Sequence, residues 1–259
     1  CGVMRRAALL SALLIVLAGC GGVISAPTTE SPGTVPPTTT PNGNIAVIGG
    51  ELPVDAETVF GRVANLTDER VDAPVIYVEP PESVSPFDDQ RSRFRAALGI
   101  TSPDPNDSES LEFAAYVPSD GNAVVVNEGI LDDEPSTEAT LAHEFVHTVQ
   151  SQRGWTNSLW VVDQEVPGGM NYDDRLTYRL VVEGAATYTE RHYVRQYLPE
   201  LAGERSFRAE YRNGSAYERL NYGPYVLGSS YVAERVDSPR DLERVHRHPP
   251  DSTEQVLHN

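Results

Sequence analysis

Residues 136–152 constrain the fold of this chain more than any other segment, because they predict a helix with two unlike faces. His143 and His147 are four positions apart, which places them one turn apart on the same face of a helix. On a helical wheel, the apolar side chains fill an arc that lies opposite this histidine pair. We therefore expect the apolar face to contact a core and the histidine face to line a cleft. The apolar arc consists of Leu141, Ala142, Phe145, Val146 and Val149.

The residues on both sides of this segment are typical of helix ends. Asp132, Asp133 and Glu134 precede it, and acidic side chains favour the positive end of a helix dipole. Ser136 is the predicted N-cap, because its hydroxyl can accept a hydrogen bond from a backbone N–H of the first turn. Gly154 is the predicted stop, because glycine adopts the left-handed conformation that ends many helices.

The histidine pair belongs to an H-E-x-x-H motif at residues 143–147. Two imidazoles one turn apart can bind the same tetrahedral Zn²⁺ ion. Glu144 falls beside them, close enough to take a proton from a water molecule at the metal. The motif also has structural explanations, either a solvated histidine pair on a surface helix or a packed helix that carries polar residues. A third ligand elsewhere in the chain favours the metal site.

Glu183 is the acid that best completes such a site. It lies within a predicted helix at residues 174–197, where a buried carboxylate is costly without a positive partner. Gly184 weakens this helix, and a close approach to the first helix would explain it. An ion pair with Arg179 is the alternative partner for Glu183. A Pro-Gly-Gly sequence follows Glu165 and disfavours it as a rival. The side chains that stay open as third ligands are Asp163, Glu165, Asp174, Glu190 and His192.

The H-E-x-x-H motif, followed by an E-x-x-A sequence at residues 183–186, resembles the gluzincin branch of the zincin metallopeptidases. The resemblance covers residues 110–258. It implies a zincin-like fold in which both histidines of the motif and Glu183 bind Zn²⁺. It also implies that Glu144 acts as the general base in the hydrolysis of peptide bonds.

Two further roles in such a site have several candidates. Zinc peptidases often use a tyrosine or histidine to stabilise the oxyanion of the transition state. A carboxylate often holds the free nitrogen of a ligand histidine, and Asp173 or Glu190 could do so here. The candidates for the oxyanion are Tyr222, Tyr225, Tyr172 and His192, and the sequence does not choose among them.

The pattern of the remaining chain predicts an α+β domain, with a small N-terminal sheet and the active-site helix followed by a mostly helical half. Strands are expected at residues 74–78, 111–117 and 123–127, the last two forming a hairpin around the turn at residues 119–122. Helices are expected at residues 55–66, 87–98, 136–152 and 174–197, with weaker signals at residues 224–236 and 239–246.

Both cysteines of the chain, Cys1 and Cys20, lie near its start, so the body can form neither a disulfide nor a thiolate metal site. A charged segment precedes an apolar run at residues 7–18, which is too short for an ordinary membrane span. The sequence Leu-Ala-Gly-Cys at residues 17–20 resembles a lipobox. The resemblance implies that Cys20 is lipidated and becomes the first residue of the mature protein.

These signals divide the chain into three parts. We expect a lipoprotein signal peptide at residues 1–19, a Thr/Pro-rich tether at residues 20–44 and a metallopeptidase domain at residues 45–259. The protein is then held on the extracellular face of the cell membrane through the lipid at Cys20. The chain ends directly after a helix-start signal at Ser252, so the domain is expected to be cut short at its C-terminus.

The charge of the chain is strongly negative. It has 38 acidic residues against 20 basic ones and contains no lysine, so every side-chain cation besides histidine is an arginine. This balance disfavours nucleic acid as a partner. Acid-rich, lysine-free folded proteins resemble those of haloarchaea, where concentrated salt screens the repulsion between like charges.

Two hypotheses for function follow. The first is a cell-surface zinc metallopeptidase that acts on peptides or proteins. The second is a non-catalytic binding or structural protein of the cell envelope on the same scaffold. Glu144 favours the first, because a purely structural zinc helix needs the two histidines and not an acid beside them. The oligomeric state and the cleavage preference do not follow from the sequence.

Overall fold

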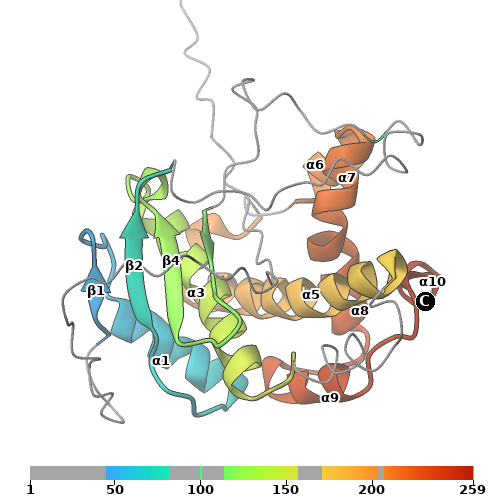
Figure 1. The fold of residues 1–259 in the computed structure, drawn as a ribbon, viewed down its shortest axis with the longest axis horizontal. Coiled ribbons are helices and arrows are strands. Elements are labelled where there is room, and N and C mark those ends of the chain that lie inside the picture. Colours follow the sequence, from blue (N-terminus) through green and yellow to red (C-terminus); the bar gives the residue numbers. More distant parts are fainter. Residues whose placement is uncertain (1–44, 82–99, 101–113, 157–170, 204–206, 259) are drawn as a thin grey trace, which may run out of the picture.

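The computed structural model describes residues 45–81, 100, 114–156, 171–203 and 207–258. Within these residues the fold is mixed α+β, with a small sheet on one side and a mostly helical remainder, which confirms the predicted class (Figure 1). The predicted signal peptide, tether, Cys20 and helix at residues 87–98 lie outside the described part. In the ranges given above, no helix is both long and apolar enough to cross a membrane.

The sheet has four strands in the order β1-β2-β4-β3. The strands are β1 (Val47–Ile48), β2 (Val75–Glu79), β4 (Ala123–Asn127) and β3 (Ala115–Tyr116). The first three are parallel, whereas β3 pairs antiparallel with β4 along the opposite edge. The predicted hairpin is therefore confirmed in its described part, while the parallel pairing was not predicted.

The turn between β3 and β4 has the chemistry that its sequence predicts. Gly121 has a positive φ of 67°, a conformation that glycine adopts without strain. Its backbone N–H donates to the carbonyl oxygen of Pro118 over 2.9 Å. The Asp120 side chain accepts from the backbone N–H of Asn122 over 3.1 Å. These contacts set the register of β4, whose Val124 and Val126 are fully buried.

Helix α1 (Ala56–Thr67) connects β1 to β2 and packs on α3. Asp55 caps it, because its carboxylate accepts from the backbone N–H groups of Glu57 and Thr58. Its Phe60 meets Phe145 of α3 edge to face, with ring centroids 5.1 Å apart. The helix thus supplies the apolar partner that the α3 pattern requires.

Helix α3 (Glu134–Gln152) carries the H-E-x-x-H motif. The prediction of Ser136 as N-cap is wrong: Asp133 is the N-cap, and its carboxylate accepts from both the backbone N–H and the hydroxyl of Ser136. Pro135 explains the earlier start, because proline fits the first turn, where no intrahelical N–H is needed. The predicted stop is confirmed, with Gly154 at a φ of 66°.

Helix α5 (Tyr172–Tyr197) is 26 residues long and lies against α3 (Figure 1). It starts with a capping box, in which Asn171 and Asp174 each accept from the other's backbone N–H. A polar cluster connects it to the earlier helices. Glu138 of α3 accepts from the hydroxyl of Tyr193 and from the guanidinium of Arg62, each over 2.7 Å. The two helices that hold the site are thereby fixed side by side.

The rest of the described chain consists of short helical segments around α5. The segment η4 is a π-helix that runs directly on from α7 and into α8. The predicted helix start at Ser252 is confirmed by α10. The segments are η2 (Glu128–Ile130), η3 (Pro199–Leu201), α6 (Arg208–Asn213), α7 (Ala216–Gly223), η4 (Pro224–Gly228), α8 (Ser229–Ala233), η5 (Pro239–Asp241), α9 (Leu242–Arg247) and α10 (Thr253–Leu257).

Gly184 marks the point where η4 crosses α5. A Cβ atom at Gly184 would overlap the backbone of Gly228, and one at Gly228 would overlap the carbonyl of Leu180. The expectation that Gly184 permits contact with the first helix is therefore wrong, because its close neighbour is η4. This contact brings the π-helix to the turn of α5 that carries Glu183.

Candidate metal centre

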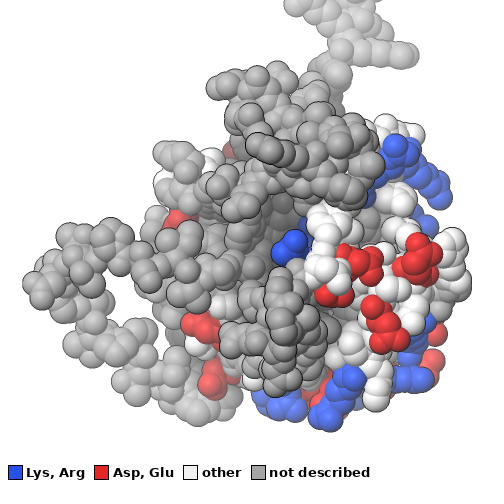
Figure 2. Space-filling model, turned by 45° about the vertical axis from the view of Figure 1, so that its right-hand side comes forward, with Lys and Arg blue, Asp and Glu red and all other residues white. Residues whose placement is uncertain are grey.

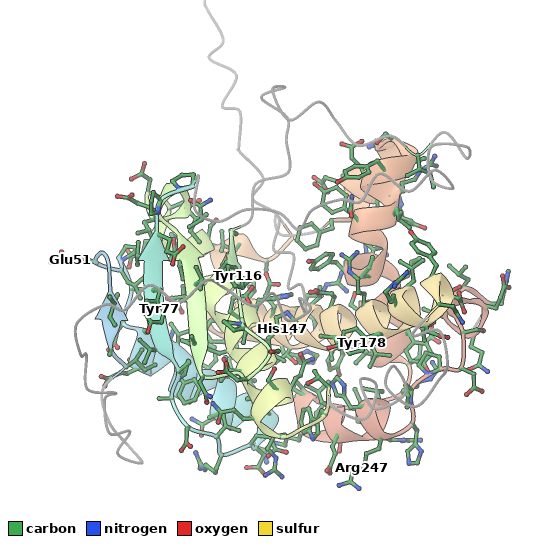
Figure 3. The ribbon with its side chains drawn as sticks, in the orientation of Figure 1. Glu51, Tyr77, Tyr116, His147, Tyr178 and Arg247 are labelled. Carbon is green, nitrogen blue, oxygen red and sulfur yellow. The ribbon has the colours of Figure 1, made fainter. Side chains whose placement is uncertain are left out.

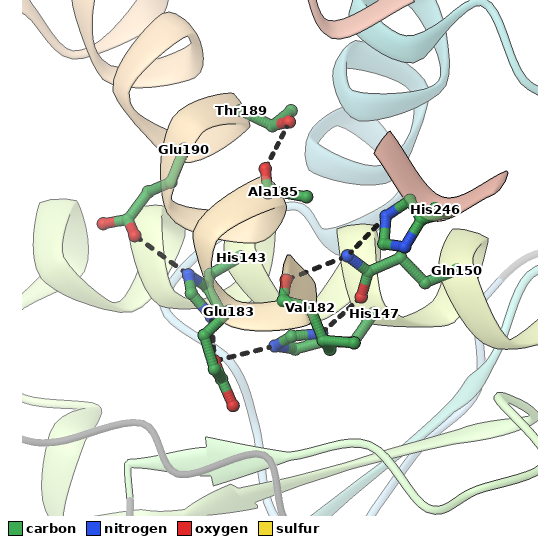
Figure 4. Close-up of polar contacts among 9 residues, drawn as sticks. All are labelled: His143, His147, Gln150, Val182, Glu183, Ala185, Thr189, Glu190 and His246. Carbon is green, nitrogen blue, oxygen red and sulfur yellow. Dashed lines mark hydrogen bonds and ion pairs between the residues drawn. The ribbon is translucent and has the colours of Figure 1, made fainter. Parts of the chain in front are cut away.

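Helices α3 and α5 bring His143, His147 and Glu183 together in the interior (Figures 3 and 4). Glu183 Oε2 lies 3.4 Å from Nε2 of His143 and 3.4 Å from Nε2 of His147. The two imidazole rings are 4.8 Å apart between centroids. The alternative ion pair between Glu183 and Arg179 is not formed among the described residues, since the Glu183 carboxylate faces the histidines.

The other nitrogen of each imidazole faces an oxygen acceptor. His143 Nδ1 is 3.0 Å from Oε2 of Glu190, and His147 Nδ1 is 2.7 Å from Oε1 of Gln150. The amide of Gln150 is oriented by its nitrogen, which donates to the carbonyl oxygen of Val182 over 3.0 Å. Each Nδ1 is therefore placed to donate to its acceptor, and each Nε2, which faces Glu183, is the nitrogen on the side where a metal ion would bind.

This convergence of acceptors requires a positive charge. Two imidazole lone pairs and a carboxylate repel one another unless a cation or a proton lies between them. Within the described part, His147 Nε2 and Glu183 Oε1 are buried without a hydrogen-bond partner. The set of two neutral imidazoles and one carboxylate is one that Zn²⁺ accepts, with a further position left for water. The residues present thus fit a metal ion.

The pKa values of His143 and Glu183 reflect the attraction between the imidazoles and the carboxylates. Burial lowers the pKa of His143, but Glu183 and Glu190 outweigh it and raise that pKa to about 10. Burial raises the pKa of Glu183, yet His147 and His143 bring it down to about 2. Without a metal ion, a proton on His143 stabilises the two carboxylates around it.

Glu144 takes no part in the contacts among His143, His147 and Glu183. Both its carboxylate oxygens are buried, and neither has a hydrogen-bond partner in the described ranges. Burial raises its pKa to about 7, with the two histidines acting in the opposite direction. A carboxyl group with such a pKa can accept and return a proton near neutral pH.

Two acids compete for the place of the third ligand. Ligand atoms of His143, Glu144 and His147 all lie within 4.8 Å of one another, so this buried group could hold a metal ion. Glu183 is the better third ligand, because one of its oxygens is 3.4 Å from both Nε2 atoms. Glu144 is then left without a ligand role and stays available as a base.

Tyr225 is the tyrosine candidate nearest to the histidines. Its ring centroid is 6.0 Å from that of His143, and its hydroxyl is buried. Burial, followed by the negative charge of Glu183, raises its pKa well above the usual value. The hydroxyl therefore keeps its proton. The π-helix η4 places this ring, as π-helical turns often do at functional sites.

Tyr222 faces other groups. Burial raises its pKa to about 12, with added effects from the carboxylates of Glu210 and Glu218. Its ring stacks on Phe207, with centroids 5.5 Å apart. Tyr172 begins α5, about three turns before Glu183 and so roughly 16 Å away along the helix. The geometry thus favours Tyr225 over both.

The remaining candidates take other roles or lie outside the described residues. Asp174 belongs to the capping box of α5, and Asp173 accepts from the hydroxyl of Thr253 at the start of α10. His192 Nδ1 donates to the carbonyl oxygen of Tyr188 over 2.9 Å. None of these three is part of the metal group. Glu190 contacts His143 through Nδ1, and the rivals Asp163 and Glu165 fall in a range that the structure does not describe.

Gln150 and His246 are part of the polar surroundings of the site, and neither was predicted from the sequence. Gln150 lies one turn after His147 on α3, and its amide nitrogen is 3.4 Å from Nε2 of His246 on α9. His246 is buried, and its ring stacks on Trp155 with centroids 5.2 Å apart. Burial, and then His147, lowers its pKa to about 3, so this ring is neutral. The position of Gln150 three residues after the motif was the only signal in the sequence.

The expectation of an open cleft on the histidine face is wrong for the described residues. His143 is 1% exposed, Glu144 0% and His147 3%. The polar face of α3 packs against α5, so helix-to-helix packing encloses the group instead of opening it to solvent. In Figure 3, His147 lies in the interior, whereas Arg247 projects outward from α9.

Comparison with protein-family models, curated proteins and solved structures finds no match for this chain. The class of protein therefore follows from the fold and the site themselves. The chain is a mixed α+β protein with a buried group, formed by His143, Glu144 and His147, that could hold a metal ion.

Proposed function

We propose that this protein is a zinc-dependent metallopeptidase of the gluzincin type, with His143, His147 and Glu183 as the metal ligands. The observation that carries the proposal is the position of Glu183 Oε2, 3.4 Å from the Nε2 atoms of both motif histidines. The acid of the motif, Glu144, is left unpaired beside them among the described residues. Metal-dependent hydrolysis needs one set of residues to bind the metal ion and a separate residue to act as the base.

When bound by these ligands, Zn²⁺ lowers the pKa of a water molecule and polarises a carbonyl group. Glu144 would accept a proton from the attacking water at its carboxylate and return it to the amine nitrogen, as the water oxygen bonds to the carbonyl carbon and the C–N bond breaks. Tyr225 donates a hydrogen bond from its hydroxyl to the developing oxyanion. Glu190 and Gln150 accept from the Nδ1–H groups and thereby hold both imidazoles in the orientation for binding.

The sequence signals place this activity on the outside of the cell. A lipid on Cys20 anchors the chain to the membrane, the Thr/Pro-rich tether at residues 20–44 gives it reach, and residues 45–259 form the peptidase domain. Its substrates are peptides or proteins. The net charge of −18 disfavours nucleic acid as a partner.

A second function is favoured by one observation, the burial of the centre. Glu144 is 0% exposed, and a substrate carbonyl has to come within reach of it. A metal ion enclosed in this way would stabilise the contact between α3 and α5 in a non-catalytic protein of the cell envelope.

The two functions separate in one experiment with a general protein substrate such as casein. Zinc content and cleavage are measured for the wild type, Glu144→Gln and Glu134→Gln, a matched control on the exposed start of the same helix. Loss of the base is expected to lower kcat by about 10²- to 10⁴-fold while zinc is retained. Glu134→Gln is expected to behave as the wild type. Bound zinc without any cleavage that depends on Glu144 would support the envelope protein.

A further inference from the structure

A cavity of about 290 Å³ lies on the side of α5 that faces η3 and α6. Three arginines surround it: Arg191 and Arg195 are one turn apart on α5, and Arg208 begins α6. Apolar side chains, including Leu201 and Phe207, form the rest of its wall. We refer to this hollow as the arginine cavity.

The arginine cavity is unusual in a chain with 38 acidic and only 20 basic residues. Figure 2 shows acidic side chains gathered on the described surface, with arginines mostly around them. Within the described ranges, neither Arg191 nor Arg195 forms an ion pair. Local positive charge is thus concentrated at one hollow of a molecule that is negative as a whole.

The charges around the arginine cavity repel one another. Burial lowers the pKa of Arg191, and Arg208 and Arg195 lower it further, while Glu190 opposes them. Like charges one turn apart on a helix are destabilising, and partial burial strengthens the effect. An anion in the cavity would remove this repulsion.

The arginine cavity adjoins the metal centre through two shared walls. Glu190 is part of its lining, and the Oε2 atom of the same residue contacts Nδ1 of His143. Phe207 lines it as well, with its ring 4.9 Å from that of Tyr225, which in turn lies 6.0 Å from His143. One side chain, Glu190, thus connects the cavity to His143 directly, and two rings, those of Phe207 and Tyr225, connect it on the other route.

We propose that the arginine cavity binds a carboxylate of the peptide substrate, with Arg191 and Arg195 as its principal contacts. A guanidinium group presents paired N–H donors that match the two oxygens of a carboxylate. The apolar wall at Leu201 and Phe207 accommodates the hydrocarbon part next to that carboxylate. The role as a substrate site rests on the proposed peptidase function, whereas carboxylate binding itself does not require the metal.

The test uses the full chain without zinc, so that its result does not depend on the peptidase function. Three ligands are titrated by calorimetry at one fixed salt concentration: N-acetylleucine, its amide, and N-acetylisoglutamine, which has only a side-chain carboxylate. The variants are Arg191→Gln and Arg195→Gln. Arg247→Gln is the matched control, since Arg247 is an exposed arginine of α9 that pairs with Glu243 and is not part of the cavity lining.

At least one carboxylate ligand is expected to bind tenfold or more tightly than the amide, and each cavity variant should lose this preference. Preference for N-acetylleucine would assign the site to a chain end, and preference for N-acetylisoglutamine to an acidic side chain. Thermal unfolding of Arg191→Gln should occur at the same or a higher temperature than that of the wild type. Equal binding of all three ligands would overturn the proposal, as would unchanged affinity in both variants. A lower unfolding temperature for Arg191→Gln, together with unchanged affinity in Arg195→Gln, would assign the arginines to structure alone.

Discussion

At the scale of single residues, the proposed metal centre depends on which nitrogen of each histidine carries a hydrogen. Glu190 and Gln150 accept from the Nδ1–H groups, so the two Nε2 atoms are left for the ion. Gln150 does more than Glu190, because its amide also donates to the carbonyl oxygen of Val182, the residue before Glu183. One side chain therefore fixes a ligand on α3 and the turn that carries a ligand on α5.

Replacing Gln150 tests this double contact. Gln150→Leu removes the acceptor for His147 and is expected to weaken zinc binding by about 10- to 100-fold. Gln150→Glu keeps an acceptor oxygen and should retain most of the affinity, while it loses stability because the donor to Val182 is gone. Zinc affinity is measured by competition with a chelator, alongside urea unfolding of the zinc-free protein. Equal zinc affinity in wild type and Gln150→Leu, with Gln196→Leu as an exposed control, would show that Gln150 is structural only.

The two tyrosine candidates give a matched pair for catalysis. Tyr225→Phe removes the hydroxyl next to His143 and is expected to lower kcat by about 100-fold with little change in KM. Tyr222→Phe should keep kcat within a few-fold of the wild type, because its ring faces Phe207, Glu210 and Glu218. Steady-state kinetics on a peptide substrate, with zinc content measured for each variant, decide between them. A larger loss from Tyr222→Phe would reverse the assignment.

At the scale of elements, the site is made by the crossing of α3, α5 and η4. The crossing of η4 over α5 needs two glycines, Gly184 and Gly228, at the point of contact. The π-helical turn then directs Tyr225 inward, next to the carboxylate of Glu183. The positions of Glu144, the two histidines, Glu183 and Tyr225 are thus set by backbone packing as well as by the motif.

Gly228→Ala tests the crossing. The added methyl group would overlap the backbone of Leu180, which cannot move as a flexible side chain could. We expect the free energy of unfolding to fall by about 1–3 kcal/mol. Gly61→Ala is the matched control, because Gly61 lies in α1 with open space at its Cβ position, and alanine favours a helix by about 1 kcal/mol. Urea unfolding of both variants measures the difference, and a stable Gly228→Ala variant would contradict the close packing.

Structure that depends on residues close together in the sequence was predicted, whereas pairing between distant residues was not. The helices α1, α3 and α5 were predicted from local periodicity and end signals, and the hairpin from its turn residues. The parallel pairing of β1, β2 and β4 was not predicted, because the partners of parallel strands are distant in the sequence and no local pattern selects them. The predicted N-cap, Ser136, differs from the observed one, Asp133, because both side chains carry a suitable oxygen within one turn of each other.

The same distinction applies to the site. The spacing of the motif placed His143, Glu144 and His147 on one helix, and the cost of burying a carboxylate identified Glu183. Gln150 and His246 could not be recognised in this way, because their contact joins residues 96 positions apart. The prediction of a cleft on the histidine face was wrong because a helical wheel shows that a face is polar but does not show which element packs against it.

At the scale of the whole molecule, charge and burial determine how the fold responds to its medium. A formal charge of −18 destabilises any compact state through repulsion, and salt reduces that repulsion between exposed groups. Salt screens buried groups much less, and their contribution to stability depends on pH. His246, at the contact of α3 with α9, is the buried histidine held neutral.

His246 makes the fold sensitive to acid. Its pKa is about 3 when folded and about 6.5 when unfolded, so the unfolded chain takes up the proton first as pH falls. The contribution to stability is complete above about pH 6.5 and is lost progressively toward pH 3. Between pH 7.5 and 5.0 the wild type is expected to lose about 2 kcal/mol more than His246→Phe. Urea unfolding at both pH values measures this difference, and parallel losses in the two proteins would refute the assignment.

The metal content of the purified protein tests whether His143, His147 and Glu183 bind zinc. Wild type, Glu183→Gln and the exposed control Glu200→Gln are dialysed against dilute zinc and then against metal-free buffer, and zinc is determined by mass spectrometry. The account predicts about one zinc ion per chain in the wild type and in the control, and far less in Glu183→Gln, because one of three protein ligands is lost. A wild type that retains no zinc, or a Glu183→Gln variant that retains as much as the wild type, would contradict it.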